Sequence, residues 1–206
     1  MNGIKNLIFD LGGVILNIDF ALTEQAFEKL GLSGFSQYMT RFHITSFFKE
    51  YEVGRISDAE FIQELRDLLP QPVSDEAIIT AWNALLLDFP AERIELLLNL
   101  KNHYRLFLLS NTNSLHFQAF QQQLHAQTGF LMEDLFEKTY YSHACHLRKP
   151  DAAIYELVIK ENNLLPAETL FMDDTETNFS GAQEVGLQVI HIKPGQSIME
   201  LPFIKG

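Results

Sequence analysis

Four polar motifs stand in a fixed order along the chain, most of them directly after a strand-like apolar run. They are Asp10 after Asn6-Leu7-Ile8-Phe9, Ser110-Asn111 after Leu106-Phe107-Leu108-Leu109, Lys149-Pro150, and Asp173-Asp174 after Leu170-Phe171-Met172. In an open parallel sheet the strands end along one edge, and ligands bind in the crevice there. The sequence therefore predicts that carboxylate, hydroxyl, amide and ammonium groups meet at one edge of a sheet.

Short runs that are apolar or rich in β-forming residues and lack clean alternation are typical of strands that are covered on both faces. Five such runs lie at residues 5–9, 104–109, 138–141, 169–172 and 188–192. Helical patterns occupy residues 91–102, 115–127, 152–161 and 177–185. Strands that alternate with helices predict right-handed crossovers and an α/β fold with a doubly wound parallel sheet.

The segment between the first two predicted strands contains helical patterns only. Helices are predicted at residues 23–30, 35–51, 61–69 and 77–86, with a capping box that begins at Ser57. Helices inserted in this way can form a bundle of their own, which we interpret as a cap over the sheet edge. The predicted domains are a core of residues 1–20 and 89–206 and a helical cap of residues 21–88.

Composition limits the partners of the chain. A net charge of −12 argues against nucleic acid or an anionic membrane, because both need a basic face. Cys145 is the one cysteine, so neither an internal disulfide nor a cysteine zinc cluster is expected. The chain has no pattern of a signal peptide or a membrane span, and the reducing cytoplasm is the expected location. The oligomeric state cannot be inferred from the sequence.

The acidic motifs suit phosphate chemistry with a divalent cation. A carboxylate at a strand end, such as Asp10, can attack phosphorus, and the glycines after it let the backbone approach a ligand. Two adjacent acids, Asp173 and Asp174, are tolerated more easily when a cation lies beside them. Alone, Asp10 could be a turn residue and the acid pair a helix cap. Together these hard oxygen ligands favour a Mg²⁺ site over a zinc site.

The remaining motifs suit the phosphate itself. Ser110 and Asn111 offer a hydroxyl, an amide and backbone N–H groups at the start of a predicted helix, where they could bind phosphoryl oxygens or cap the helix. Lys149 would neutralise both Asp10 and a bound phosphate. A lone lysine is more often a solvated surface residue, so the position of Lys149 supports this interpretation rather than its type. We expect its replacement to weaken catalysis with little loss of folding stability.

The order of the motifs, with a helical insert after the first, resembles the haloacid dehalogenase superfamily over essentially the whole chain. Longer strings resemble bacterial phosphatases that act on α-glucose-1-phosphate and similar small sugar phosphates. These strings are Phe9-Asp10-Leu11-Gly12-Gly13-Val14-Ile15, Asn17-Ile18-Asp19-Phe20, Glu52-Val53-Gly54-Arg55-Ile56-Ser57, Leu109-Ser110-Asn111-Thr112-Asn113 and Arg148-Lys149-Pro150.

The resemblance implies a Rossmann-like core and a Mg²⁺-dependent phosphatase for small phosphorylated metabolites. It implies that Asp10 is the nucleophile, that Asp174 is a direct Mg²⁺ ligand, and that Asp173 is a ligand or a water-mediated support. It assigns the phosphoryl group to Ser110, Asn111 and Lys149.

One position departs from this pattern. Most phosphatases of the superfamily carry a second aspartate two residues after the nucleophile, where this chain has Gly12. Gly12 can still offer its backbone carbonyl to Mg²⁺, but it cannot act as the general acid/base, which contributes roughly 10²–10⁴-fold in rate. Leaving groups of low pKa should then be favoured, such as the anomeric oxygen of a sugar-1-phosphate. Asp19 is the nearest ionisable candidate to replace the acid, although it could be only a linker or N-cap residue.

Two cap residues are candidates for substrate contact, and two other functions are possible alternatives. Arg41 and His43 lie close together in the predicted cap, although a surface position suits His43 as well. A metal-independent 2-haloacid dehalogenase also lacks the second acid, but the adjacent acids 173 and 174 would repel its carboxylate substrate. A non-catalytic protein of the same fold is supported mainly by Gly12. The intact set of Asp10, Lys149 and the acid pair favours the phosphatase.

Overall fold

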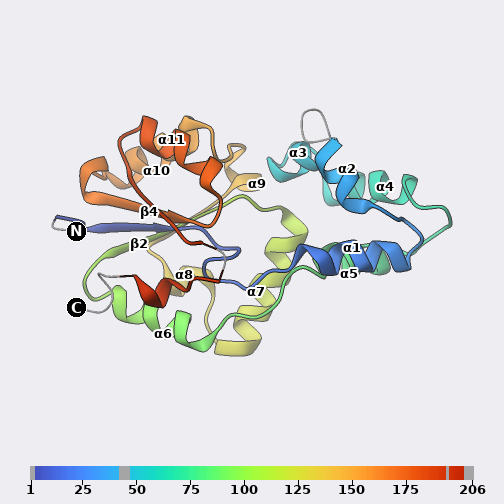
Figure 1. Cartoon of the computed structure of the whole chain (residues 1–206), viewed down its shortest axis with the longest axis horizontal. Helices are drawn as coiled ribbons and strands as arrows, with labels where there is room; N and C mark the ends of the chain where they lie inside the picture. The colour runs from blue at the N-terminus through green and yellow to red at the C-terminus, as the bar shows by residue number, and fades with distance from the viewer. Residues whose placement is uncertain (1–2, 42–46, 194, 202–206) are drawn as a thin grey trace.

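Five parallel strands form the single sheet of the computed structural model, which describes residues 3–41, 47–193 and 195–201 and, of residues 39–41, only the backbone (Figure 1). Their order across the sheet is β3-β2-β1-β4-β5, and every neighbouring pair is parallel. The strands are β1 (Asn6–Phe9), β2 (Arg105–Ser110), β3 (Lys138–Tyr141), β4 (Thr169–Asp173) and β5 (Gln188–His191). The predicted doubly wound α/β sheet is confirmed, and each strand lies within one or two residues of its predicted range.

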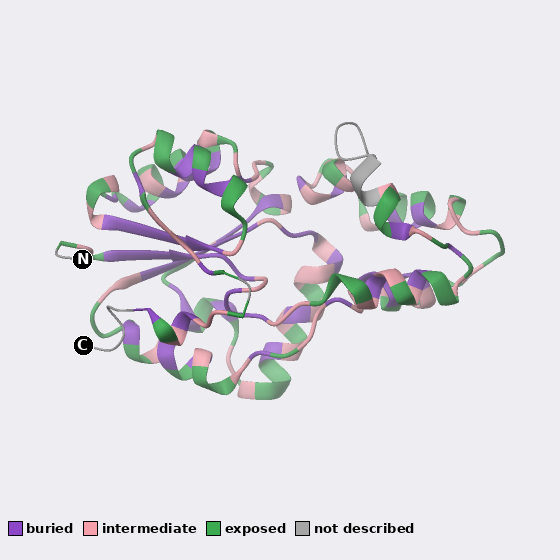
Figure 2. Cartoon of the chain, in the orientation of Figure 1, coloured by how far each residue is buried: buried purple, intermediate pink, exposed green. Residues whose placement is uncertain are grey.

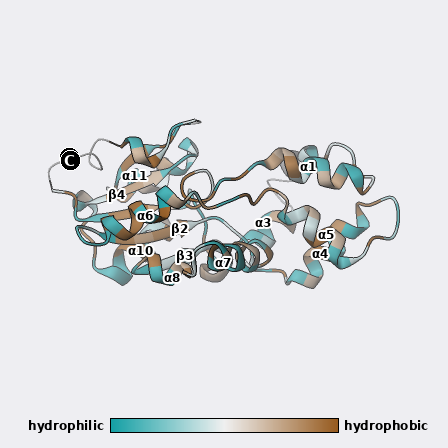
Figure 3. Ribbon diagram, turned by 90° about the horizontal axis from the view of Figure 1, so that it is seen from below, coloured by the Kyte–Doolittle hydropathy of each residue, from teal (hydrophilic) through white to brown (hydrophobic). Residues whose placement is uncertain are grey.

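Helices cover both faces of the sheet, and each face has its own hydrophobic core. One face packs against α6 (Ala91–Leu100), α7 (Ser114–Thr128) and α8 (Met132–Leu135). The other packs against α10 (Ala152–Asn162) and α11 (Phe179–Glu184). The three central strands are therefore buried from both sides, which explains why β1, β2 and β4 are mostly apolar (Figures 2 and 3). Short helical segments complete the described fold: α9 (Ser142–Cys145) and 3₁₀ turns at Pro166–Glu168, Glu176–Asn178 and Ile198–Glu200.

The insert between β1 and β2 is helical and lies to one side of the sheet (Figure 1). Its helices are α1 (Phe20–Lys29), α2 (Phe35–Arg41), α3 (Phe47–Glu52), α4 (Asp58–Asp67) and α5 (Asp75–Asn83). They enclose a third hydrophobic cluster around Phe27, Phe61 and Trp82, and Ser57 forms the expected capping box before α4. The helix predicted over residues 35–51 corresponds to α2 and α3 at its two ends, and its middle lies outside the described residues.

Two antiparallel linkers join the insert to the sheet. Asn17 donates its backbone N–H to Asp88 O (2.9 Å) and accepts from Leu87 N–H (2.9 Å), and Asp19 N–H donates to Leu85 O (2.9 Å). A further contact places the Trp82 ring of α5 on the His116 ring of α7, with centroids 4.8 Å apart and planes at 11°. No helix within the described ranges is long and apolar enough to cross a membrane.

Candidate active site

The carboxyl edge of the sheet brings three of the predicted motifs together through the strand order. Asp10 directly follows the central strand β1, while Ser110 ends β2 and Asp173 ends β4, the two neighbours of β1. The backbone N–H of Asp10 donates to Met172 O at 2.9 Å, which fixes Asp10 beside the end of β4. Residues more than a hundred positions apart in the sequence thus meet at one edge, as expected for an open parallel sheet.

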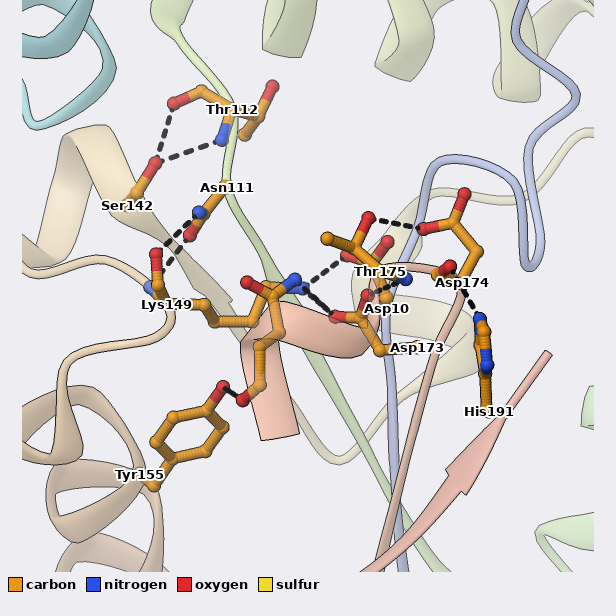
Figure 4. A network of polar contacts seen from close by, with 11 residues as sticks. Asp10, Asn111, Thr112, Ser142, Lys149, Tyr155, Asp173, Asp174, Thr175 and His191 are labelled. Atoms are coloured by element: carbon orange, nitrogen blue, oxygen red, sulfur yellow. Dashed lines mark hydrogen bonds and ion pairs between the residues drawn. The ribbon is translucent and has the colours of Figure 1, made fainter. Parts of the chain in front are cut away.

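Lys149 lies between two carboxylates at this edge (Figure 4). Its Nζ is 2.6 Å from Asp10 Oδ1 and 2.6 Å from Asp173 Oδ2, and its side chain is 1% exposed. Burial on its own would lower the pKa of Lys149, but the two carboxylates more than offset this and raise it, so the ammonium stays protonated. The predicted proximity of Lys149 to Asp10 is present, whereas its contact with Asp173 was not expected from the sequence.

Both carboxylate oxygens of Asp173 accept hydrogen bonds from groups of the protein. Oδ1 accepts from the Thr175 backbone N–H at 2.7 Å, and Oδ2 accepts from Lys149 and from Asn178 Nδ2 at 2.9 Å. The residue is fully buried. These contacts suit a support that orients Lys149 and the turn after β4, so the geometry favours the supporting role over direct metal ligation.

Asp174 points toward the loop that follows Asp10. Its Oδ2 lies so close to Gly13 that a Cβ at position 13 would be only 2.2 Å away. Gly13 also has a φ of +73°, a conformation that favours glycine. The side chain is half-buried, and its Oδ1 accepts from Thr175 Oγ1 at 3.1 Å. The glycine after Gly12 is therefore what admits the Asp174 carboxylate to the edge of the site.

The carboxylates of Asp10 and Asp174, with Asp173 as their support, fit a hard divalent cation. Asp10, Asp173 and Asp174 each offer an oxygen, and these oxygens all lie within 4.8 Å of one another. Burial raises the pKa of Asp10 to about 7, Lys149 opposes this rise, and Asp173 and Asp174 add to it. Burial is the main cause of the raised pKa of Asp174, and the nearby charge of Asp173 raises it further. A bound cation would relieve this repulsion, and oxygen-only ligands match the preference of Mg²⁺.

Asn111 acts on Lys149 rather than facing the phosphate with its amide. Its Nδ2 donates to Lys149 O and its Oδ1 accepts from Lys149 N–H, both at 2.9 Å. Both ends of the side-chain amide are thus occupied by the backbone of Lys149. The side-chain amide is therefore used in a clamp on Lys149 rather than in the predicted contact to a phosphoryl group, and the phosphate contact of the buried Ser110 stays a prediction.

The other predicted site residues are placed as follows. Gly12 lies beside Ile18, whose Cδ1 would be 3.0 Å from a Cβ at position 12. Asp19 is exposed and caps α1, accepting from the Ala21 backbone N–H at 2.9 Å, so the N-cap interpretation accounts for its carboxylate. Arg41 ends α2, but its side chain lies outside the described part of the chain, as does the whole of His43.

Sequence reasoning missed several residues that position these groups. Asn178 holds Asp173 from the turn after β4, and nothing in its sequence context marks it out. The pair Gly12-Gly13 is visible in the sequence, but the close approach of Asp174 to Gly13 is not predictable from it. Glu52 and Arg148 belong to the sequence strings that resemble the phosphatases, but their pairing is not predicted from the sequence. They form an ion pair between the insert and the segment before Lys149.

Comparisons with known proteins agree with this geometry. The family described as haloacid dehalogenase-like hydrolase matches residues 4–186. D-ribitol-5-phosphate phosphatase from Bacteroides thetaiotaomicron is 33% identical over 192 residues, which cover 93% of each chain. A crystal structure of a family enzyme from that organism, in complex with magnesium and inorganic phosphate, is 38% identical, with a TM-score of 0.86, and the match covers 94% of this chain and 96% of that one.

More distant relatives share the architecture. A predicted family hydrolase from Porphyromonas gingivalis is 28% identical with a TM-score of 0.86, and the match covers 98% of this chain and 97% of the other. L-2-haloacid dehalogenase from Xanthobacter autotrophicus is 23% identical with a TM-score of 0.59 over 92% of this chain and 77% of that one, a likeness of fold alone. The family match and the relative above 30% identity lead to one conclusion: this chain belongs to the haloacid dehalogenase-like hydrolases.

Proposed function

We propose that this chain is a Mg²⁺-dependent phosphatase that hydrolyses phosphate monoesters of small sugars or sugar alcohols through an aspartyl-phosphate on Asp10. The observation that carries the proposal is the position of Lys149, buried between Asp10 and Asp173 with Asp174 beside them. In the proposed reaction, this arrangement would bring a carboxylate nucleophile, a fixed positive charge and a metal ligand within reach of one phosphoryl group. The magnesium- and phosphate-bound relative and the D-ribitol-5-phosphate phosphatase support the same chemistry.

The reaction would proceed in two displacements at phosphorus. Because Oδ1 of Asp10 is paired with Lys149, Oδ2 is the oxygen that attacks; the P–O bond to the alcohol breaks, and the alcohol leaves with a proton from solvent. Water then attacks the aspartyl-phosphate, which releases inorganic phosphate and regenerates Asp10. Lys149, Ser110 and the backbone N–H groups after β2 would hold the phosphoryl oxygens in both steps.

Asp10, Asp174 and the backbone carbonyl of Gly12 are the groups that would hold Mg²⁺. When bound, the ion supplies positive charge that balances the carboxylates and the phosphate dianion. Asp173 would remain outside the direct ligand set, because both of its oxygens are occupied by protein donors.

The substrate class follows from two arguments. Without an acid at position 12, a leaving group of low pKa is expected to react faster, which favours an anomeric phosphate such as glucose-1-phosphate. The relative that acts on D-ribitol-5-phosphate supports instead a phosphorylated sugar alcohol. Both are small polyhydroxylated phosphate esters, and we propose that the helical insert of residues 21–88 acts as a cap domain that selects among them.

A phosphate-release assay tests the proposal. Glucose-1-phosphate, ribitol-5-phosphate, glucose-6-phosphate and an aryl phosphate are compared with Mg²⁺ and after chelation. Asp10→Asn should abolish turnover, while Asp151→Asn is a matched control because Asp151 is exposed and caps no backbone group of α10. Full turnover in Asp10→Asn or after rigorous chelation would contradict the proposal. Chloride release from 2-haloacids without Mg²⁺ would favour the dehalogenase alternative, and phosphate binding without turnover would favour a binding protein.

A further inference from the structure

An ion pair links the helical insert to the segment that carries Lys149. Arg148 Nε donates to Glu52 Oε1 at 2.5 Å, and the two side chains are only 19% and 27% exposed. Glu52 is the last residue of α3, and Arg148 directly precedes Lys149 in the sequence. This pair therefore reaches from the insert to within one residue of the proposed catalytic ammonium group.

Two further contacts show that this part of the insert is docked on the core over a continuous surface. Val53 O lies 2.9 Å from Nδ1 of His146, a hydrogen-bond distance. Gly54, with φ +68°, packs so tightly that a Cβ there would lie 2.1 Å from the backbone oxygen of His143. Figure 1 shows the end of α3 facing α9 across the junction. Residues 52–54, the docking segment, thus contact residues 143–148 at three points.

The segment before Lys149 is held from two sides. From the core, Asn111 binds the N–H and C=O of Lys149. From the insert, the docking segment binds Arg148 and His146. The core clamp involves core residues only, whereas the second set of contacts requires the insert to be docked. A movement about the linkers 17–19 and 85–88 would separate Glu52 from Arg148.

We propose that Glu52 is a positioning residue for catalysis, an inference that rests on the role proposed above for Lys149. When the insert is docked, Glu52 fixes Arg148 and thereby the placement of Lys149 between Asp10 and Asp173. When the insert moves away, the Arg148 guanidinium loses its carboxylate and the segment loses one of its two anchors. Docking of the insert and readiness of the catalytic lysine are in this way coupled through one ion pair.

The test compares Glu52→Gln with Glu50→Gln. Glu50 is a matched control because it lies on the same helix and pairs with Arg55 inside the insert, at 3.1 Å, without reaching the core. We expect Glu52→Gln to lower kcat on the order of tenfold with a smaller change in KM, and Glu50→Gln to change kcat less than about twofold. A purely structural role would instead lower the unfolding midpoint and leave kcat per folded molecule unchanged, which would overturn the proposal.

A double-mutant cycle identifies the partner. If Glu52 acts through Arg148, the double variant Glu52→Gln/Arg148→Gln should lose no more kcat than the more impaired single variant. Losses that multiply would show that Glu52 acts by another route and would contradict the proposal.

Amide hydrogen exchange separates this inference from the proposed function. Exchange at residues 143–149 should be faster in Glu52→Gln than in wild type or Glu50→Gln, and this is measured without any substrate. If wild type hydrolyses no ester of the panel, the proposed function fails while exchange still decides whether Glu52 holds this segment. Equal exchange in all three proteins would overturn the inference even if the enzyme is active.

Discussion

The carboxylate of Asp174 occupies the space into which any side chain at position 13 would project. Oδ2 of Asp174 would lie 2.2 Å from a Cβ built on Gly13, well inside contact distance, and the backbone there has φ +73°. The second glycine after the proposed nucleophile is thus required by a residue that follows it by 161 positions (174 − 13). Gly13 belongs to the proposed metal site although it offers the metal no side chain.

Replacement of Gly13 should therefore damage metal binding specifically. Gly13→Ala forces Asp174 away from Asp10, so Mg²⁺ affinity measured by calorimetry should fall by at least about tenfold, the equivalent of losing a group that orients a ligand. Gly129→Ala is the control, because Gly129 has a similar φ of +77° with nothing within 4 Å of its Cβ. That variant should lose stability, roughly 1–2 kcal/mol, but keep its Mg²⁺ affinity. Equal affinity in both variants would contradict this view of Gly13.

Removal of Lys149 should now be expected to destabilise the fold as well as the reaction. The sequence led to an expectation of little stability loss, but Lys149 is buried and paired with two carboxylates. Lys149→Met would leave Asp10 and Asp173 facing each other without a counter-charge, and breaking a buried pair in this way costs about 3–5 kcal/mol. Urea unfolding at neutral pH without Mg²⁺ measures the loss. A loss in the free energy of unfolding below about 1 kcal/mol would instead support the expectation from the sequence that Lys149 contributes little to folding stability.

The stability of the metal-free protein should depend on pH through Asp10. Burial raises the pKa of Asp10 from 3.8 to about 7, so between these values the folded protein holds a proton that the unfolded chain has released. Stability from this group therefore falls as pH rises through that window. Thermal melts across the window in the presence of a chelator should show the fall, and Asp10→Asn should flatten it. If stability instead rises over the same pH window and the rise depends on Asp10, the raised pKa of Asp10 is contradicted.

Mg²⁺ affinity should change with pH in the opposite direction. Binding requires the ionised carboxylate of Asp10, so affinity should rise with pH and level off above about 7. Calorimetry in buffers of different ionisation enthalpy measures the protons released with Mg²⁺. An affinity that is independent of pH across this range would argue against Asp10 as a ligand.

An acid introduced at position 12 should help most on esters with poor leaving groups, and trimming Ile18 should make room for it. A Cβ at Gly12 would lie 3.0 Å from Ile18 Cδ1, so Gly12→Asp alone competes with this side chain for space. The double variant Gly12→Asp/Ile18→Ala should gain most on a primary phosphate such as ribitol-5-phosphate, whose leaving oxygen needs a proton most. Comparison of kcat for that ester and for an aryl phosphate measures the gain. An equal gain on both esters would show that protonation does not limit the reaction.

The fold was largely predictable because its signals are local. Short runs that are apolar or rich in β-forming residues identified all five strands, and the Ser57 capping box marked the start of α4. The order of strands in the sheet was not predicted, since it depends on contacts between distant segments. The first helix of the insert was predicted from Thr23, whereas α1 begins at Phe20 and is capped by Asp19, as the N-cap interpretation of Asp19 implies.

The site was predictable in its residue types but not in its hydrogen bonding. Strand ends predicted that Asp10 and Asp173 lie near one another, yet nothing local indicates that Asn178 and Thr175 would occupy the oxygens of Asp173. The same limit applies to Asn111, whose amide is used by a backbone 38 residues further along. The order of the motifs predicts which groups lie close together, whereas the hydrogen-bond partner of each oxygen depends on how the whole chain packs.

The paired linkers also bear on how this enzyme could change over time. Because Asn17 and Asp88 are hydrogen-bonded neighbours, the insert leaves and rejoins the sheet almost at one point. For the core, a loop closed by such a pair costs conformational entropy that grows only slowly with its length. Helices can thus be added, removed or exchanged between residues 17 and 88 while β1 and β2 keep their register. Under the roles proposed above, substrate range could then evolve within the insert, while the ion pair of Glu52 with Arg148 keeps the insert tied to the segment that carries Lys149.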